Sequence, residues 1–288
     1  MDTEIIAVYC LCDHMLKAMQ RVEDRQCQMS DAEVMTTAIV AAHYFGGNIE
    51  LARALLKRQT YIPAMLSHSR LNRRLHRVKE MFLALFSALA EHWKALNRPS
   101  LYVVDTFPVA VCDIYRVLRV RIYQGGAYRG YTASKRRHFY GLKIHLMVTA
   151  QGQPVEFFLT PGSCGDITGL YGFDYRLPGG AQICADKAYN DYLVEEELAE
   201  LDITLLPIRK KNSKRPHPPE LSAWIAAQRK VVETAGSLIH RRLPKSIHAV
   251  TAAGFELKVV LFVLGLSLHH VLRWQLELIR NSFSYTNR

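Results

Sequence analysis

The chain changes character near Pro99, and this change limits its fold more than any other feature of the sequence. Residues 1–97 read as helical throughout. Beyond Pro99, short β-rich runs alternate with helical patterns, and no internal repeat is visible. Helices followed by strands mixed with helices predict an α/β core with a mixed sheet and flanking helices, preceded by an all-helical N-terminal module.

Helix signals in the first part are specific enough to place individual ends. Ser30 and Glu33 have the spacing of a capping box, in which each residue bonds the other's backbone N–H. Asn48 is a suitable N-cap for a second helix over 48–57. A long helical stretch is predicted over 69–96, with a basic first part and an apolar second part.

Two of the β-rich runs, 101–105 and 181–186, end in an aspartate. The segment 113–137 is rich in Arg, Gly and Tyr and reads as irregular. Further strands are expected at 139–149, 154–160 and 203–208, with a hairpin turn at 150–153, and further helices at 190–201 and from 220 to about 279.

Charge points to a polyanionic partner. The 288 residues include 37 Lys and Arg against 26 Asp and Glu, a formal net charge of +11. The basic residues are clustered, which favours nucleic acid over a merely soluble basic protein. Hydrophobic residues make up 49% of the chain, enough for a folded core, so disorder does not describe the whole.

Other classes of protein fit the sequence poorly. None of the six cysteines forms a C-x-x-C pair, which argues against a structural zinc site and favours free thiols in a reducing cytoplasm. The start of the chain is acidic and unlike a signal peptide. The longest uncharged apolar stretch, 259–272, is shorter than the ~20 residues that span a bilayer. We therefore expect a cytoplasmic protein without a membrane partner.

Three acids stand out by their context. Asp105 and Asp186 end β-rich runs, and Glu233 lies on a probable helix. Carboxylates at the ends of neighbouring strands can converge, and a helix across the sheet can add a third. Hard cations such as Mg²⁺ prefer oxygen ligands, and two ions roughly 3.5–4 Å apart can drive phosphodiester chemistry. Acids at strand ends also cap turns or face water, so spacing alone leaves both interpretations open.

Several segments in a fixed order resemble a known family. They are Val103 to Val109, Lys135 to His145, Leu159 to Asp166, Ala185 to Tyr189 and Arg229 to Thr234. Together they resemble the DDE transposases of bacterial insertion sequences, especially the insertion sequence 982 family, over roughly residues 100–275. The ordered series carries the resemblance; no single segment does.

The resemblance implies an RNase H-like catalytic domain at 99–280, after a helical module at 1–98 for DNA binding or dimerisation and before a tail at 281–288. It implies that Asp105, Asp186 and Glu233 are the catalytic residues and hold two Mg²⁺ ions, with Mn²⁺ as an alternative. Water would cut the strand at the element's end, and the freed 3′-OH would attack target DNA without a covalent protein–DNA intermediate.

One departure concerns the helix that carries Glu233. Some related transposases show a Tyr, Arg, Glu, Lys signature there. Arg229 and Glu233 fit that signature, but Ala226 stands at the Tyr position and His240 at the Lys position. The role of this helix in DNA binding is therefore less defined than that of Glu233, which no acid between Glu220 and Glu256 rivals.

Basic residues in four regions are candidates for DNA contact. Arginine pairs with phosphates, and Tyr123, Tyr128 and Tyr131, which Arg116, Arg119 and Arg121 precede or surround, can stack on bases. Solvated loops and a solvent-facing helix are the alternatives, and the helical module can serve dimerisation instead. The candidates are Arg70, Arg73, Arg74, Arg77, Arg129, Lys135, Arg136, Arg137, Lys143, Arg209, Lys210, Lys211 and Arg229.

Four further polar residues have structural interpretations. Asp113, a rival metal ligand, reads as a surface or turn residue. Asp166 reads as the cap of the helix that follows it, with a supporting place beside the metal ligands as the alternative. His138 and His145 lie on a predicted strand, where a lone histidine is usually packed or hydrogen-bonded.

The sequence therefore predicts a transposase whose partners are double-stranded DNA, namely the element's terminal inverted repeats and its target, and further copies of itself in a homodimer or larger assembly. Two other functions stay open: an RNase H-like endonuclease that cuts without joining, and a catalytically silent DNA-binding regulator.

Overall fold

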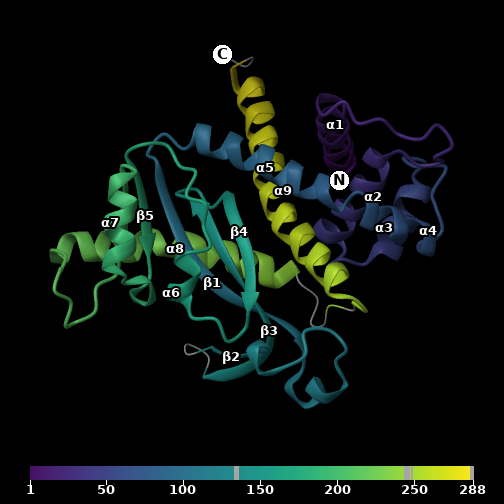
Figure 1. Cartoon of the computed structure of the whole chain (residues 1–288). Coiled ribbons are helices and arrows are strands. Elements are labelled where there is room, and N and C mark those ends of the chain that lie inside the picture. Colours follow the sequence, from purple (N-terminus) through teal and green to yellow (C-terminus); the bar gives the residue numbers. More distant parts are fainter. Residues whose placement is uncertain (133–135, 243–246, 248, 286–288) are drawn as a thin grey trace. The chain divides into compact units, whose positions relative to one another are not determined.

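A computed structural model describes the backbone of residues 1–132, 136–242, 247 and 249–285, and side chains through residue 273 apart from those of 240 and 242 (Figure 1). The chain forms two compact units. Unit 1 contains residues 1–88, 241–245 and 253–288, and unit 2 contains residues 89–240 and 246–252. This division differs from the expected boundary at 98/99, because the last helix groups with the N-terminal helices rather than with the sheet.

Unit 1 is built around one buried helix. Almost every residue of α2 from Asp31 to Ala42 is buried, in keeping with its apolar sequence. The capping box at its start is confirmed: the Glu33 backbone N–H donates to Ser30 Oγ (3.1 Å) and the Ser30 N–H donates to Glu33 Oε2 (2.7 Å). The helices of this unit are α1 (Asp2–Ala18), α2 (Asp31–Tyr44), α3 (Ile49–Arg58), α4 (His68–Arg77), the first part of α5 (Lys79–Leu96) and most of α9 (Ala252–Tyr285).

The stretch predicted as one helix over 69–96 is two helices, α4 and α5. The chain leaves α4 at Val78, which is fully buried, and no Gly or Pro marks the break. Buried Asp31 lies beside α4 and forms ion pairs with Arg74 (2.6 Å) and Arg21 (3.2 Å). Two arginines around one buried carboxylate supply the pairing that burial of a charge requires.

Helix α9 belongs to the core of unit 1. Its Phe262 ring lies 3.0 Å from where a Cβ on Gly47 would stand, so Gly47, with a φ of +82°, allows this close approach. Of the described residues, only 252–273 in this helix are long and apolar enough to cross a membrane, with a mean hydropathy of 1.7. Two thirds of that window (67%) is buried inside the structure, in keeping with the expected core helix.

Unit 2 contains a mixed six-stranded sheet with the order β2-β3-β1-β5-β6, and β4 also pairs with β3. Strand β1 pairs antiparallel with β3 and parallel with β5, and β6 extends the parallel side. The strands are β1 (Leu101–Cys112), β2 (Arg129–Thr132), β3 (Arg137–Thr149), β4 (Pro154–Pro161), β5 (Ala181–Ala185) and β6 (Ile203–Pro207). The mixed sheet that the sequence predicts is thus present.

The register of two strands positions the acids. Val103 of β1 pairs with Cys184 of β5 in a parallel ladder. Asp105 and Asp186 each stand two residues beyond this pair, so the parallel direction brings them close together where β5 ends. The prediction that Asp105 ends its strand was wrong, because β1 continues to Cys112 in its pairing with β3.

Short helices and turns complete unit 2. Helix α8 runs across the strands in Figure 1, and a Cβ on its Gly236 would stand 3.4 Å from the Phe107 ring of β1. The segment predicted as irregular holds two 3₁₀ turns and the short strand β2. The remaining elements are η1 (Ile114–Arg119), η2 (Gly126–Tyr128), α6 (Asp166–Leu170), η3 (Lys187–Tyr189), α7 (Tyr192–Glu200) and α8 (Pro219–Arg242).

Candidate active site

The three acids selected from the sequence line one cleft of about 590 Å³ in unit 2. Asp105 comes from β1, Asp186 from the residue after β5, and Glu233 from the middle of α8. Residues that sequence reasoning did not assign to the site line it too: Thr106, Phe107, Pro108, Tyr131, Thr132, Phe139 and Asp166.

The two aspartates are held in the same way. Asp105 Oδ1 accepts a hydrogen bond from the backbone N–H of Thr106 (2.8 Å). Asp186 Oδ1 accepts one from the N–H of Lys187 (2.7 Å) at the start of η3. Each carboxylate thus has one oxygen fixed by the backbone, and the second oxygen of Asp105 lies 3.5 Å from a guanidinium nitrogen of Arg229.

Arg229 lies among all three acids. Its guanidinium nitrogens are 3.5 Å from Asp105, 3.4 Å from Asp186 and 3.6 Å from Glu233. The side chain is only 13% exposed, and its buried Nε has no hydrogen-bond partner in the described part of the chain. Arg229 and Glu233 share a face of α8 because they are four residues apart. A single cation therefore compensates three carboxylates.

Burial affects the protonation of Asp105. The pKa of this carboxyl is raised to about 6, because desolvation outweighs the stabilising effects of the Thr106 N–H and Arg229. A raised pKa means that the site favours either a proton or a cation beside Asp105.

Asp166 adds a fourth carboxylate beside the triad. Its Oδ1 accepts hydrogen bonds from Thr106 Oγ1 (2.7 Å) and Lys143 Nζ (2.8 Å). The sequence interpretation of Asp166 as a helix cap was wrong: the N-cap of α6 is Gly165, and no side chain caps it. The Asp166 side chain instead turns toward β1 and β3, where it anchors Lys143, a predicted DNA contact.

The donor chemistry of the cleft fits a hard divalent cation. Four carboxylates with two basic side chains leave two negative charges uncompensated in the cleft, and carboxylate oxygens are the ligands that such cations take. Among the described residues, no three His, Cys, Asp or Glu side chains are grouped closely enough to hold an ion as they stand. Arg229 occupies the space between them, so ion binding requires this guanidinium to move.

This cleft lies within a segment that matches a known family. A family model described as a transposase DDE domain matches residues 97–246, just over half of the chain. The chain belongs to this family of DDE transposases. The matched segment contains Asp105, Asp186 and Glu233, and it begins just before β1.

Other comparisons add little to the DDE assignment. No curated protein matches the chain. One solved structure, a piggyBac transposase synaptic complex with hairpin DNA, aligns over 91% of this chain and 71% of its own, at 11% identity and a TM-score of 0.44. A likeness of that size carries no argument about this chain.

The predicted DNA-contact residues of this DDE transposase differ in how they are placed. Arg70, Arg73 and Arg77 of α4 are exposed, whereas Arg74 faces inward to Asp31. Arg129, Arg136 and Arg137 are exposed around β2 and β3, and Lys135 lies outside the described residues. The exposed arginines of α4 and those around β2 and β3 are therefore accessible to a phosphate. Arg74 already pairs with a buried carboxylate.

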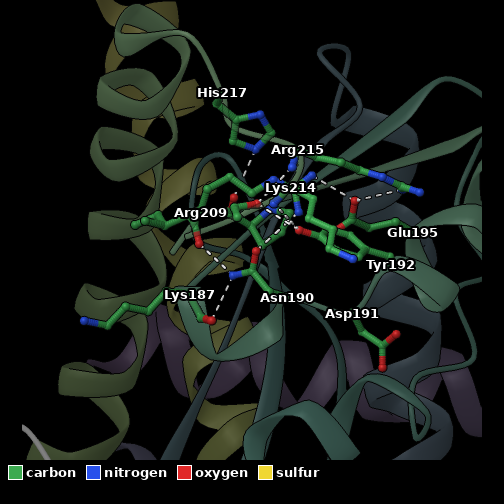
Figure 2. A network of polar contacts seen from close by, with 12 residues as sticks. Lys187, Asn190, Asp191, Tyr192, Glu195, Arg209, Lys214, Arg215 and His217 are labelled. Carbon is green, nitrogen blue, oxygen red and sulfur yellow. Dashed lines mark hydrogen bonds and ion pairs between the residues drawn. The ribbon is translucent and has the colours of Figure 1, made fainter. Parts of the chain in front are cut away.

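The basic residues of the loop 209–215 also differ, because some are paired within the protein and others are exposed. Figure 2 shows Arg209 and Arg215 close to Tyr192, with guanidinium carbons 5.6 Å and 4.6 Å from its ring centre. Arg209 also binds both carboxylate oxygens of Glu195 (2.5 and 2.8 Å), and Arg215 pairs with Glu196. These arginines fasten the loop to α7, and the exposed Lys210 and Lys211 remain as candidates for phosphate contact.

Asp113, His138 and His145 lie outside the cleft lining, as their structural interpretations predicted. Asp113 is exposed at the start of η1 and does not line the cleft. His138 is exposed, with its ring 4.8 Å from that of Tyr131. His145 is fully buried, stacks on Phe158 at 4.6 Å, and its Nε2 lies 2.9 Å from Thr160 Oγ1.

Buried His145 predicts a pH dependence of stability. Burial lowers the pKa of its imidazole to about 4, so the unfolded chain takes up a proton near pH 6.5 that the folded one refuses. Stability present above pH 6.5 is therefore lost as pH falls toward 4, by up to about 3 kcal/mol. Urea unfolding between pH 7 and 4 should show a flatter pH profile for His145→Asn, which does not titrate there. Equal slopes in both proteins would contradict this assignment.

Proposed function

We propose that this protein cleaves DNA at the ends of a mobile element and transfers the strands into target DNA, using Asp105, Asp186 and Glu233 to hold two divalent ions. The observation that carries the proposal is the convergence of these three acids on one guanidinium within the DDE-matched segment. Mg²⁺ is the proposed ion, with Mn²⁺ as an alternative. Bound ions would activate the attacking oxygen and stabilise the leaving one.

The chain's own residues have distinct tasks in this proposal. The backbone N–H groups of Thr106 and Lys187 orient the two aspartates that line the cleft. Asp166 holds Lys143 at the cleft, where its ammonium can bind a DNA phosphate. Arg229 compensates the negative charge of the three acids until the divalent ions bind. It can then contact the phosphate backbone of the DNA.

The finer classification is part of the same proposal. The arrangement of the sheet supports an RNase H-like core. Strands β1, β3 and β4 pair antiparallel, β5 and β6 continue the sheet in parallel to β1, and a helix that carries the third acid crosses the strands. The ordered sequence segments support a bacterial origin within the insertion sequence 982 family, and hence a cytoplasmic site of action on the nucleoid.

The proposed partners are double-stranded DNA and further copies of the chain. The terminal inverted repeats and the target DNA are the substrates, and the net charge of +11 favours a polyanion. Two element ends must be held together for transposition, which is why a homodimer or larger assembly on DNA is proposed. The helices of unit 1, with exposed Arg70, Arg73 and Arg77, are candidates for either task.

A gel assay of the purified protein tests the proposal. The probe is a labelled duplex from the element's end, taken from the DNA that flanks the coding sequence, with Mg²⁺ present or chelated and with unlabelled target plasmid. Metal-dependent cutting at the element boundary, followed by transfer of label to the plasmid, is the expected result. Cutting without transfer would support the endonuclease instead, and binding without cutting would support the silent regulator.

The basic loop 209–215 predicts a salt dependence. Replacing Lys210 and Lys211 by Gln should lower the slope of log affinity against log salt by about 0.9 for each phosphate that the loop no longer neutralises. Fluorescence anisotropy with a labelled duplex at several salt concentrations measures this slope. Arg209→Gln is the matched control: it should leave the salt slope unchanged but lower the melting temperature, because half-buried Glu195 then keeps only Arg215, at 3.9 Å, as its cation. An unchanged slope in the double lysine variant would remove this loop from the DNA surface.

A further inference from the structure

An arm formed by residues 113–128 joins β1 to β2 and exposes apolar side chains at its tip. Ile114 is 53% exposed, Tyr115 76% and Leu118 96%, all within η1. Large apolar side chains that gather on an exposed turn mark a contact surface, because water solvates them poorly.

The root of the arm is fixed to the sheet of unit 2. The hydroxyl of Tyr140, on β3, lies 2.7 Å and 3.2 Å from the carbonyl oxygens of Tyr123 and Gly125. The rings of Tyr123 and Tyr128 pack with centroids 5.1 Å apart. The exposed tip therefore stands on a root that is held in place, as a rigid contact element requires.

Charge identifies the kind of partner. Arg116, Arg119 and Arg121 are exposed on the same arm, with Asp113 as its only acid. The Arg116 guanidinium lies 5.4 Å from the ring centre of Tyr115, so cation and apolar surface adjoin. A second copy of the arm would bring the same positive charge, whereas DNA offers phosphates for the arginines and base faces for the apolar tip.

Strand β1 connects the arm to the proposed chemistry. Asp105 and Cys112, the residue before the arm, lie on this one strand. Seven residues at roughly 3.3 Å each separate them by about 23 Å. The start of the arm therefore lies several base pairs of B-form DNA from Asp105, at ~3.4 Å for each pair.

We propose that the arm is a DNA wedge, with Tyr115 and Leu118 inserting between base pairs several pairs from the cleaved phosphate, and with the three arginines on the flanking phosphates. The inference rests on the proposed function, since it takes the duplex cut in the cleft as the arm's ligand. Apolar side chains inserted at a base step unstack it and kink the duplex. Distorted DNA at this distance would hold the element's end in register with the acids.

The test measures base unstacking in the bound duplex. The probe is the element-end duplex of the cleavage assay, with 2-aminopurine, whose fluorescence rises on unstacking, placed at successive positions. The complex is made with Asp105→Asn protein so that the DNA stays uncut. We expect a several-fold rise in fluorescence centred on one step, and its loss in the added double change Tyr115→Ala with Leu118→Ala.

Matched variants separate insertion from other effects. Leu193→Ala, at an exposed leucine of α7, should keep the signal. Arg116→Gln with Arg119→Gln should keep it at low salt but lower the salt slope by about 0.9 for each phosphate that the arm no longer neutralises. Because all these side chains are exposed, unchanged melting temperatures should verify that each variant folds.

Three outcomes would overturn the wedge. A protein that cleaves DNA but unstacks no base would disprove the wedge and leave the proposed function intact. A signal unchanged in the Tyr115 and Leu118 variant, with a change in oligomeric mass, would make the arm a contact between copies of the chain. A protein that neither binds nor cuts the duplex would overturn both the wedge and the proposed function.

Discussion

Asp105→Asn is expected to abolish cleavage while leaving DNA binding largely intact. Asparagine keeps the size and the strand position of Asp105 but removes the charge that a hard cation needs. Loss of several kcal/mol of transition-state stabilisation corresponds to roughly a 10³-fold fall in rate. A single-turnover gel assay with Mg²⁺ measures the rate, and anisotropy on the same duplex measures binding.

Asp174→Asn is the matched control for this change. Asp174 is exposed, does not line the cleft and lies outside the arm. It should cleave at close to the wild-type rate, which separates the loss of one particular carboxylate from a general change in charge. Undiminished cleavage by Asp105→Asn would remove Asp105 from the mechanism.

Arg229→Gln is expected to raise the affinity of the protein for divalent ions by about tenfold, a change of ~1.4 kcal/mol. In the metal-free protein Arg229 sits 3.4–3.6 Å from all three acids, so an incoming cation competes with it. Glutamine removes the competitor and leaves the site more negative. Calorimetric titration with Mn²⁺ in the absence of DNA measures this affinity directly, whatever the activity of the variant.

The same substitution should make the metal-free protein less stable, because three carboxylates then share the cleft without their cation. Added Mn²⁺ should restore the melting temperature more fully in Arg229→Gln than in wild type. Arg229→Lys retains the charge and should bind Mn²⁺ much as wild type does. Equal or weaker affinity in the glutamine variant would show that Arg229 and the ions do not compete for the acids.

The sequence predicted which acids belong to the site better than it predicted how the fold brings them together. Asp105 and Asp186 were selected because each was predicted to end a β-rich run, which holds for Asp186 but not for Asp105, since β1 continues to Cys112. Their adjacency depends on the parallel pairing of β1 with β5, a long-range contact that short-range pattern does not encode. The catalytic roles of the triad stay predictions.

Two misjudged residues show where local patterns fail. Asp166 begins a helix, which favours a cap, but its partners Thr106 and Lys143 come from distant strands. Arg74 belongs to the same arginine series as Arg70 and Arg77, and only the position of buried Asp31 turns it inward. In both cases a tertiary partner outweighs the local preference, and a one-dimensional pattern does not identify such partners.

The helix break at Val78 and the packing of α9 also depend on tertiary contacts. No Gly or Pro marks the break between α4 and α5 at Val78. Val78 is buried there, and a local sequence pattern does not show that burial. The apolar run of α9 predicted a buried helix but not which core it would join. Apolar surface is not directional, so composition alone does not select a packing partner.

Unit 1 takes its residues from both sides of unit 2 along the chain, and this has a consequence for the order of folding during synthesis. Residues 89–240 leave the ribosome before α9, so the sheet with its three acids can form while the α2 helix still lacks part of its covering. Closing unit 1 then requires contacts between segments about 200 residues apart, such as that of Gly47 with Phe262. The helices that precede the sheet in the sequence are therefore completed after it, although they leave the ribosome before it.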